Sequence, residues 1–338
     1  MRQALILFAL VLGTSGNASP LFEDDAVLQV KLSGPLTTLI KNKKNRVEYP
    51  FTLTVGDNVI DLQVRVRGKS RVAFCRFPPL RLIFPEGNAD DTVFAGQGRI
   101  KLVTHCKNDS VRAENNILDE YLAYRLLNVI TGQSFRVRLL QLSYEDTDAK
   151  LNKLDRQYYG FLIESDQELA ARSGGKAVDI TGVRYPLLDP NQTALMYVFQ
   201  YLIGNTDWSL LTADGADTCC HNVDLIDVEG SLLPIPYDFD ASGLVNAPYA
   251  IPNANLNLRR VTERRYRGYC KAAIEDVAAA LRSIAAMKGP ILAEAQEAPE
   301  VKDGSATQRA RFLGHFFEEA EDEAELIRKF DRRCIGPY

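Results

Sequence analysis

The segment GNTDW, residues 204–208, ends an apolar run and begins a series of three polar clusters. The other two are HN at residues 221–222 and YDFD at residues 237–240. The run before the first cluster, residues 194–203, has the composition of a buried helix. Two short apolar segments within residues 223–236 separate the second cluster from the third and resemble a hairpin. This order predicts that the ends of three elements meet at one place.

The three clusters carry oxygen ligands. Asp207 follows the predicted helix, Asn222 precedes the first strand of the hairpin, and Asp238 follows the second. Two carboxylates and a carboxamide are the groups that a hard cation such as Mg²⁺ prefers. The alternative is that Asn and Asp here are ordinary turn residues.

Length and composition are those of a globular protein. The chain has 338 residues, which is enough for one large domain or for two lobes with a sizeable core. It is 46% hydrophobic and 25% charged, without low-complexity tracts. The formal net charge of −4 argues against a general nucleic-acid binder, so no nucleic-acid partner is expected.

The first 18 residues have the pattern of a secretory signal. Arg2 is followed by an apolar run, residues 4–12, that is too short to span a bilayer, and cleavage is expected after Ala18. The alternative is an uncleaved anchor. No later segment is long and apolar enough to cross a membrane, so we expect a secreted or periplasmic protein without a membrane span after cleavage.

The six cysteines of an exported chain suggest disulfides. Cys75 and Cys106 flank a strand-rich region and form a plausible pair, and a Cys270–Cys334 bond could hold the C-terminal segment. A bond between the adjacent cysteines at 219 and 220 is expected to be strained. The alternative is that the cysteines bind a zinc ion, but the chain has no CxxC motif and only three His.

Hydrophobic periodicity divides the chain into two halves. A strand-rich half with one inserted helix is followed, after a hinge near residues 164–173, by a helical half. We therefore predict an α+β, bilobal architecture, with a signal peptide (1–18), a strand-rich N-lobe (19–165) and a mostly helical C-lobe (166–338). Strands are predicted at 27–32, 51–55, 59–67, 80–84, 100–104, 135–144, 158–164, 223–228 and 231–236. Helices are predicted from Asp109-Ser110 to Gly132 and at about 191–203, 270–288 and 307–331, with a polar linker between the last two.

A cationic turn follows the strand at 59–67. The segment RVRGKSR, residues 65–71, lies in a region without acidic residues. Gly68 lets the backbone approach a ligand, while Arg67 and Lys69 can pair with phosphate oxygens. The segment lacks the spacing of a Walker A loop, and its alternative is a solvated strand face.

Lys101 is a second candidate phosphate ligand. It lies on a predicted strand, and Glu114 and Glu120 lie on the helix that follows. A strand Lys paired with a helix Glu orients the α- and β-phosphates in kinase-type sites. The alternative is an ordinary surface ion pair.

In a phosphoryl-transfer enzyme, the three polar clusters would have distinct roles. Asp207 can orient an attacking hydroxyl, while Asn222 and Asp238 hold a metal ion. The turn around Asp238 is similar to the metal-binding Asp-Phe-Gly turn of kinases, with Asp240 in the glycine position. His221 could be a base, but we favour a turn residue, and Trp208 is expected to pack in the core.

The order of these motifs resembles the CotH family, the secreted atypical protein kinases first associated with bacterial spore coats. The likeness runs over about residues 60–245. It consists of RGKS at 67–70, the Lys-containing strand at 100–104, DSVRAEN at 109–115, YGFLIE at 159–164, NTD at 205–207, Asn222 and PYDFD at 236–240.

The resemblance implies a kinase-like bilobal fold, ATP with Mg²⁺ or Mn²⁺, catalytic Asp207, and the metal ligands Asn222 and Asp238. Two features depart from the protein-kinase pattern. Fourteen residues separate Asp207 from Asn222, where a protein kinase loop has four, and the phosphate-binding turn is basic rather than glycine-rich.

The leading hypothesis is an exported CotH-like kinase that transfers the ATP γ-phosphoryl to a hydroxyl of a protein in the cell envelope or outside the cell. Lys101 would hold phosphates, supported by Glu120 or Glu114, and the strand end at Glu164 would face the adenine. One alternative is a catalytically inactive binding or scaffold protein of the envelope. Another is a nucleotidyl transferase that transfers AMP.

Overall fold

The computed structural model describes residues 19–107, 110–151, 154, 156–180, 182–210 and 219–336. The predicted signal segment and its cleavage position lie outside the described residues, as does Asp109. The β-strands are β1 (Leu28–Gly34), β2 (Tyr49–Val55), β3 (Asn58–Val66), β4 (Leu80–Ile83), β5 (Arg99–Val103), β6 (Val137–Asp146), β7 (Tyr158–Ile163), β8 (Lys176–Val178), β9 (Val223–Val228) and β10 (Ser231–Pro236).

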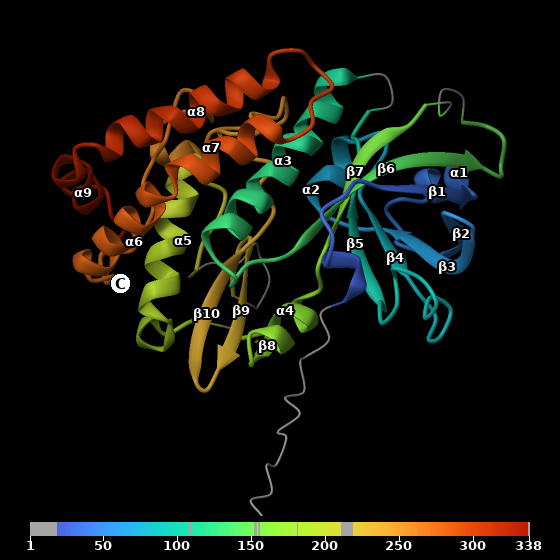
Figure 1. Ribbon diagram of the computed structural model, residues 1–338, viewed down its shortest axis with the longest axis horizontal. Helices are drawn as coiled ribbons and strands as arrows, with labels where there is room; N and C mark the ends of the chain where they lie inside the picture. The colour runs from blue at the N-terminus through green and yellow to red at the C-terminus, as the bar shows by residue number, and fades with distance from the viewer. Residues whose placement is uncertain are drawn as a thin grey trace, which may run out of the picture.

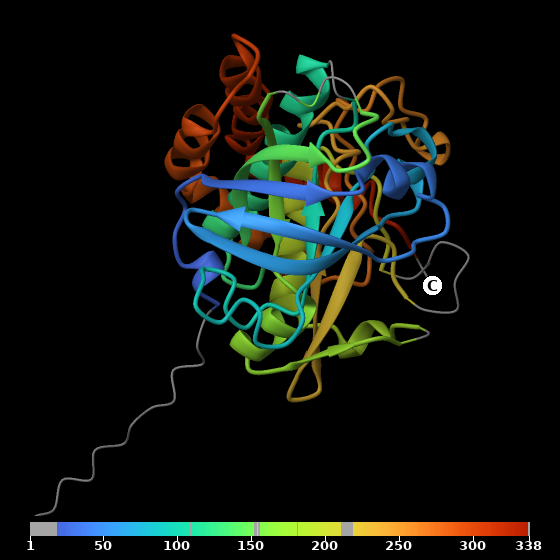
Figure 2. The same cartoon turned by 90° about the vertical axis from the view of Figure 1, so that its right-hand side faces the viewer.

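The strands β1 to β7 form a closed barrel, which faces the viewer in Figure 2. The order around the barrel is β1-β2-β3-β4-β5-β7-β6. Neighbouring strands are antiparallel except β1 and β6, which are parallel and close the ring. Alternate residues point inward, so side chains such as Leu32, Leu53, Leu62 and Leu102 form the buried core of the barrel.

The closed barrel overturns the predicted fold class. A bilobal, protein-kinase-like α+β fold with a strand-rich N-lobe and a mostly helical C-lobe is wrong for this chain. Lys31 on β1 pairs with Thr54 on β2 and with Ser143 on β6, so both edges of β1 are occupied. Apolar alternation predicts a strand and its buried face, but it does not specify the strand's neighbours, and it therefore could not reveal closure.

The α-helices and short 3₁₀ segments lie between and after these strands, together with irregular loops. The α-helices are α1 (Leu36–Lys41), α2 (Ser70–Phe74), α3 (Val111–Ile130), α4 (Asp166–Arg172), α5 (Pro190–Leu202), α6 (Ile274–Ala286), α7 (Lys288–Glu297), α8 (Ser305–Ala320) and α9 (Glu323–Asp331). The 3₁₀ segments are η1 (Pro20–Phe22), η2 (Tyr185–Leu187) and η3 (Ala254–Leu256).

Helix α3 lies between the barrel and the other large helices, as Figure 1 shows. Its first turn is capped by Ser110, whose Oγ accepts a hydrogen bond from the Ala113 amide at 3.1 Å. The helix packs against β6 and β7 of the barrel and against α7 on the helical side. Because both sides are covered, apolar and polar residues alike are buried along most of its length.

A second sheet, in the order β10-β9-β8, lies below α3 in Figure 1. The strands β9 and β10 form the predicted hairpin, with the predicted boundaries. Helix α5 packs against β10 and carries the chain toward Asp207. The hairpin therefore brings the residues before β9 and after β10 to the same end of the sheet.

All six cysteines are disulfide-bonded. The predicted Cys75–Cys106 and Cys270–Cys334 bonds are confirmed, and the adjacent residues Cys219 and Cys220 are bonded to each other as well. Among the described residues, none of the helices combines the length and the apolar composition that crossing a bilayer requires.

Candidate functional site

A cleft separates the barrel from the second sheet. Its largest cavity, of about 550 Å³, is lined on the barrel side by residues 67–70 and on the other side by residues 219–224 and Asp238, with Asp207. A smaller cavity shares the segment 67–70 and Asp238 and adds further predicted residues. The structure thus brings together at this cleft the predicted residues Arg67, Lys69, Lys101, Glu120, Asp207, Asn222 and Asp238.

A row of cations crosses strands β3, β4 and β5 of the barrel, and its member Lys101 lines the cleft. Arg65 on β3 is directly opposite Arg81 on β4, and Arg81 is directly opposite Lys101 on β5. Like charges in opposed positions are unfavourable in a sheet. Burial, and then the charges of Arg67 and Arg65, lower the pKa of Arg81. This face is therefore suited to bind an anionic ligand.

Lys101 lies at the inner end of the row. Its Nζ is 4.0 Å from Oδ2 of Asp224 and lies over the rings of Tyr237 and Phe135, at 5.0 and 5.4 Å from their centroids. Burial lowers the pKa of Lys101 and raises the pKa of Asp224 to about 6. The two groups thus form a desolvated pair between β5 and β9.

The expected pairing of Lys101 with Glu120 or Glu114 is not formed. Glu120 accepts a hydrogen bond from Arg71 at 2.6 Å, and Glu114 accepts one from Arg156 at 2.7 Å. The sequence pattern indicated a turn at residues 68–71, but Ser70 begins the short helix α2. This helix directs Arg71 toward α3, where its guanidinium takes the position expected for Lys101.

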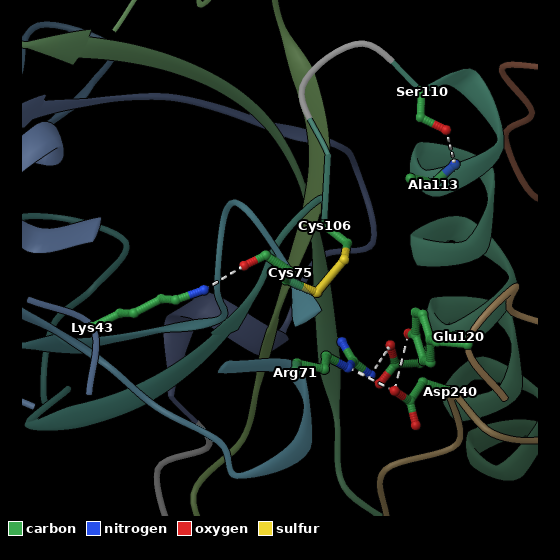
Figure 3. The surroundings of a disulfide bond; sticks show 9 residues. Lys43, Arg71, Cys75, Cys106, Ser110, Ala113, Glu120 and Asp240 are labelled. Carbon is green, nitrogen blue, oxygen red and sulfur yellow. Dashed lines mark hydrogen bonds and ion pairs between the residues drawn. A yellow bond between two sulfur atoms is a disulfide. The ribbon is translucent and has the colours of Figure 1, made fainter. Parts of the chain in front are cut away.

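Arg71 is the centre of a buried charge cluster, shown in Figure 3. Its Nη2 donates to Glu120, its Nε donates to Asp240 at 2.7 Å, and Asp238 lies 3.4 Å from Nη2. Burial raises the pKa of Glu120 to about 8, although Arg71 opposes the shift. Three carboxyl groups share one guanidinium, so the cluster has more acidic groups than cations to balance them.

Asp207 lies opposite the cationic row and contacts both residues of the second polar cluster. Its Oδ1 is 2.9 Å from Nε2 of His221. The amide of Asn222 donates to the main-chain oxygen of Asp207 at 2.8 Å and to its Oδ2 at 3.2 Å. Half of the Asp207 side chain is exposed. The carboxylate is therefore held from one side and open to the cavity on the other.

Asn222 and Asp238 both adopt left-handed backbone conformations, with φ of 54° and 59°. The amide of Tyr237, the residue before Asp238, donates to the carbonyl of Asn222 at 3.1 Å. This bond places the segment with Asp238 next to Asn222 at the end of the hairpin. The amide of Asp238 donates to the hydroxyl of Tyr124 at 2.9 Å. Asn and Asp adopt this conformation more readily than other residues that carry a side chain.

Glu164 is not brought to the cleft. Its carboxylate makes two bonds to Arg172, of 2.8 and 2.9 Å, and accepts a hydrogen bond from the amide of Arg136 at 3.0 Å. These contacts fasten α4 to the end of the barrel. The residue before it, Ile163, lines the smaller cavity instead.

The side of the cleft that carries Asp207, Asn222 and Asp238 has oxygen donors of the kind that Mg²⁺ or Mn²⁺ binds. Among the described residues, no group of three or more His, Cys, Asp or Glu side chains is placed to hold a metal ion. Mg²⁺ in phosphate-binding sites needs only one or two carboxylates, because phosphate oxygens and waters complete its shell. Burial, and then the charge of Asp240, raise the pKa of Asp238, although Arg71 opposes the shift. Asn222 and Asp238 offer oxygen donors of the types that such a cation accepts, so the chemistry of the donor set is compatible with a divalent cation bound through phosphates.

Sequence reasoning missed Arg71 and Asp224 as site residues and assigned His221 to a turn. Arg71 belongs to the basic segment 65–71, so its charge was a signal, but its partners lie far away in sequence. Asp224 is one of two acidic residues in strand β9 and follows Asn222 by two positions. The buried Trp208 packs on Tyr197, as expected, with 5.6 Å between the ring centroids.

The chain was compared with known proteins. A scan against protein-family models finds no match, and a search of curated proteins finds no related sequence.

Proposed function

We propose that this chain is an exported phosphotransferase, similar in chemistry to the CotH family, that transfers the γ-phosphoryl group of ATP to a hydroxyl of a protein. One observation carries the proposal. The cations Arg67, Lys69 and Lys101 and the acids Asp207 and Asp238 line two adjoining cavities of one cleft. The proposal concerns the chemistry of this cleft, within the closed-barrel fold described above.

The barrel side would bind the phosphates. Arg67, Lys69 and Lys101 supply the positive charge, and Arg pairs well with phosphate oxygens. Gly68 has a φ of 89°, a conformation that favours glycine, and a Cβ added there would meet no atom within 4 Å. The backbone at this position is therefore accessible to a ligand. Ile163, rather than Glu164, is the residue at the strand end that could contact the base.

The opposite side would hold the metal ion and the acceptor. Asn222 and Asp238 would bind Mg²⁺ or Mn²⁺, which supplies positive charge against the phosphates when bound. Asp207 would orient the acceptor hydroxyl. The hydroxyl oxygen forms a bond to the γ-phosphorus, the bond from this phosphorus to the β–γ bridging oxygen breaks, and ADP leaves. The hydroxyl proton goes to Asp207, with His221 2.9 Å from the same carboxylate.

The location of the protein is part of the proposal. Three disulfides are compatible with an oxidising environment outside the cytoplasm. Together with the predicted signal segment, they support secretion or a periplasmic location. The acceptor would then be a protein of the envelope or the exterior.

The test uses the purified chain from residue 19 onward. Thermal unfolding is measured with ATP, with and without Mg²⁺ or Mn²⁺, and we expect an increase in Tm that requires both ATP and metal. Transfer is then measured with ATP labelled at the γ-phosphate and, separately, at the α-phosphate. Label from the γ-position alone supports the proposal, and label from the α-position indicates AMP transfer. A chain that neither gains stability nor transfers label would be a binding or scaffold protein instead.

A further inference from the structure

The Cys219–Cys220 disulfide lies in the wall of the proposed phosphotransfer cleft. Both cysteines line the cavity of about 550 Å³, together with Asp207, His221 and Asn222. Among the described residues that line either cavity of the cleft, these two are the only cysteines. The bond is therefore placed where a change in its redox state would alter the cleft itself.

This disulfide contributes little to stability through loop closure. It joins residues with a sequence separation of 1, whereas the other two disulfides have separations of 31 and 64. In the chain-entropy model, the stabilisation by a disulfide increases with the length of the loop that it closes. The effect of the Cys219–Cys220 bond is therefore local, because the small ring that it forms restricts the backbone and side chains of these two residues.

The segment that this ring restricts leads directly to the residues that contact Asp207. The backbone of His221 exchanges two hydrogen bonds with that of Ser209, at 2.9 and 3.0 Å. Nε2 of His221 lies 2.9 Å from the Asp207 carboxylate, and the amide of Asn222 donates to this carboxylate at 3.2 Å. A change of conformation at residues 219–220 is therefore passed to the next two residues, which position Asp207.

Both cysteines of this bond are partly exposed, so an external thiol can reach it. Thiol–disulfide exchange requires that a thiolate contact one of the two sulfur atoms. The Cys75–Cys106 bond is shielded, because its two residues are only 1% and 9% exposed. The Cys270–Cys334 bond is accessible, but it lines neither cavity of the cleft. Of the two accessible disulfides, one therefore belongs to the cleft.

We propose that the Cys219–Cys220 disulfide is a redox switch of the phosphotransfer cleft; its effect on nucleotide binding rests on the function proposed above. The reductant is a dithiol. One of its thiolates attacks a sulfur of the bond, a mixed disulfide forms, and the other cysteine leaves as a thiolate that takes up a proton. The second thiol of the reductant then displaces the remaining cysteine, and the reductant becomes a disulfide. Two electrons and two protons pass to the chain.

Reduction opens the ring and returns rotational freedom to residues 219 and 220. The segment that carries His221 and Asn222 must then be ordered again before Mg-ATP can bind. Ordering the backbone of one residue costs about as much free energy as a tenfold change in affinity. We therefore expect the reduced chain to bind Mg-ATP about tenfold more weakly than the disulfide-bonded chain.

The first measurement needs no nucleotide. The full chain from residue 19 is titrated with dithiothreitol, and the emission of Trp208, the single tryptophan, is recorded because this residue adjoins Asp207. The free thiols are then alkylated, and the labelled cysteines are identified by mass spectrometry. We expect labelling at residues 219 and 220 before Cys75 and Cys106. The emission change should follow this labelling and reverse on oxidation.

Two results of this measurement overturn the proposal. One is labelling of Cys75 and Cys106 first, and the other is unchanged emission when residues 219 and 220 are fully labelled. The matched control is Cys270→Ser/Cys334→Ser, which removes the other accessible disulfide and should give the wild-type response. The variant Cys219→Ser/Cys220→Ser should give no emission response to dithiothreitol.

The second measurement is the affinity for Mg-ATP by equilibrium dialysis, with and without dithiothreitol. The wild type should lose affinity about tenfold on reduction, whereas Cys219→Ser/Cys220→Ser should bind weakly under both conditions. Affinity that is unchanged on reduction overturns the switch and leaves the proposed phosphotransferase standing. A chain that binds no Mg-ATP in either state, but shows the labelling and emission responses, overturns the proposed function and retains the disulfide as a conformational switch.

Discussion

Nζ of Lys101 lies 4.0 Å from Oδ2 of Asp224. The pair joins β5 of the barrel to β9 of the second sheet at the base of the cleft. Both side chains are partly buried, so each supplies a countercharge to the other. Lys101 is therefore held toward the hairpin, rather than toward the helix that follows it in sequence.

Variants of the Lys101–Asp224 pair allow the effects on ligand binding and on folding stability to be told apart. Lys101→Met should weaken Mg-ATP binding by about 10- to 100-fold, because it removes a charged donor to the phosphates. It should also lower the free energy of unfolding by about 1–2 kcal/mol, because Asp224 loses its partner. Titration calorimetry and urea unfolding measure the two effects.

The double variant Lys101→Met/Asp224→Asn should recover most of that stability but not the nucleotide affinity. Lys41→Met, at an exposed position of α1, is the matched control and should change neither quantity. Wild-type affinity in Lys101→Met would remove Lys101 from the proposed phosphate site.

Asp224 makes stability depend on pH. Burial raises its pKa to about 6 from the ordinary value of 3.8, so between these values the folded chain keeps a proton that the unfolded chain releases. Stability from this group therefore falls as pH rises through that window, by about 3 kcal/mol in total. Asp224→Asn should remove this contribution. Urea unfolding at pH 4 and pH 7 measures the difference.

The control for this pH dependence is Asp227→Asn, on the same strand. Its side chain accepts a hydrogen bond from the Gly230 amide, which an Asn oxygen can also accept. We expect the pH slope of this variant to match the wild type. An unchanged slope in Asp224→Asn would mean that Asp224 is already ionised at pH 4.

Asp207 and Asp238 should respond differently to the same substitution. Asp238→Asn is expected to weaken Mg-ATP binding by about tenfold or more, because a neutral amide is a poorer ligand for a divalent cation. Asp207→Asn should leave that affinity nearly intact and slow phosphoryl transfer by about 10²- to 10⁴-fold. The control Asp61→Asn lies on β3 outside both cavities. Wild-type behaviour of both site variants would show that the two residues only shape turns.

The Cys75–Cys106 disulfide supports the charge cluster in Figure 3. It joins the end of α2, which carries Arg71, to the segment after β5, and it closes a loop with a sequence separation of 31. Replacing both cysteines with Ser should lower the free energy of unfolding by about 3–4 kcal/mol. Because α2 loses its attachment, Mg-ATP affinity should fall too.

The variant Cys270→Ser/Cys334→Ser provides a matched comparison. This bond closes a longer loop, of separation 64, and lines neither cavity of the cleft. Its loss should reduce stability by a similar amount and leave nucleotide affinity unchanged. Equal losses of affinity in both variants would indicate a general effect of destabilisation.

Individual elements were predictable because their signals are local. The hairpin β9–β10 was predicted with its observed boundaries, and Ser110 was predicted to cap the long helix α3. Helix α7 was missed because its polar, Pro-containing sequence is typical of a linker, and the predicted helix at 307–331 is divided into α8 and α9. The barrel itself depends on pairing between distant strands, for which periodicity carries no signal.

The same distinction applies to the candidate site. The polar clusters with Asp207, Asn222 and Asp238 were predictable, because they lie at ends of elements that a hairpin brings together. The partners of the charged groups were not. Arg71 and Glu120 are 49 residues apart, and their contact depends on how α2 and α3 pack across the barrel. Residue types indicate which side chains are candidates for a site, but the pairing of the charged groups required the structure.

The parallel pair of β1 and β6 can form only late in the synthesis of the chain. Ser33 and Glu145 are opposite each other in this pair and are 112 residues apart. Synthesis proceeds at about 5–20 residues per second, so β1 leaves the ribosome several seconds before its second neighbour. During that time the nascent chain exposes a strand edge that can pair with other chains. A chaperone that binds residues 28–34 would therefore prevent such pairing most effectively early in synthesis, before β6 has emerged.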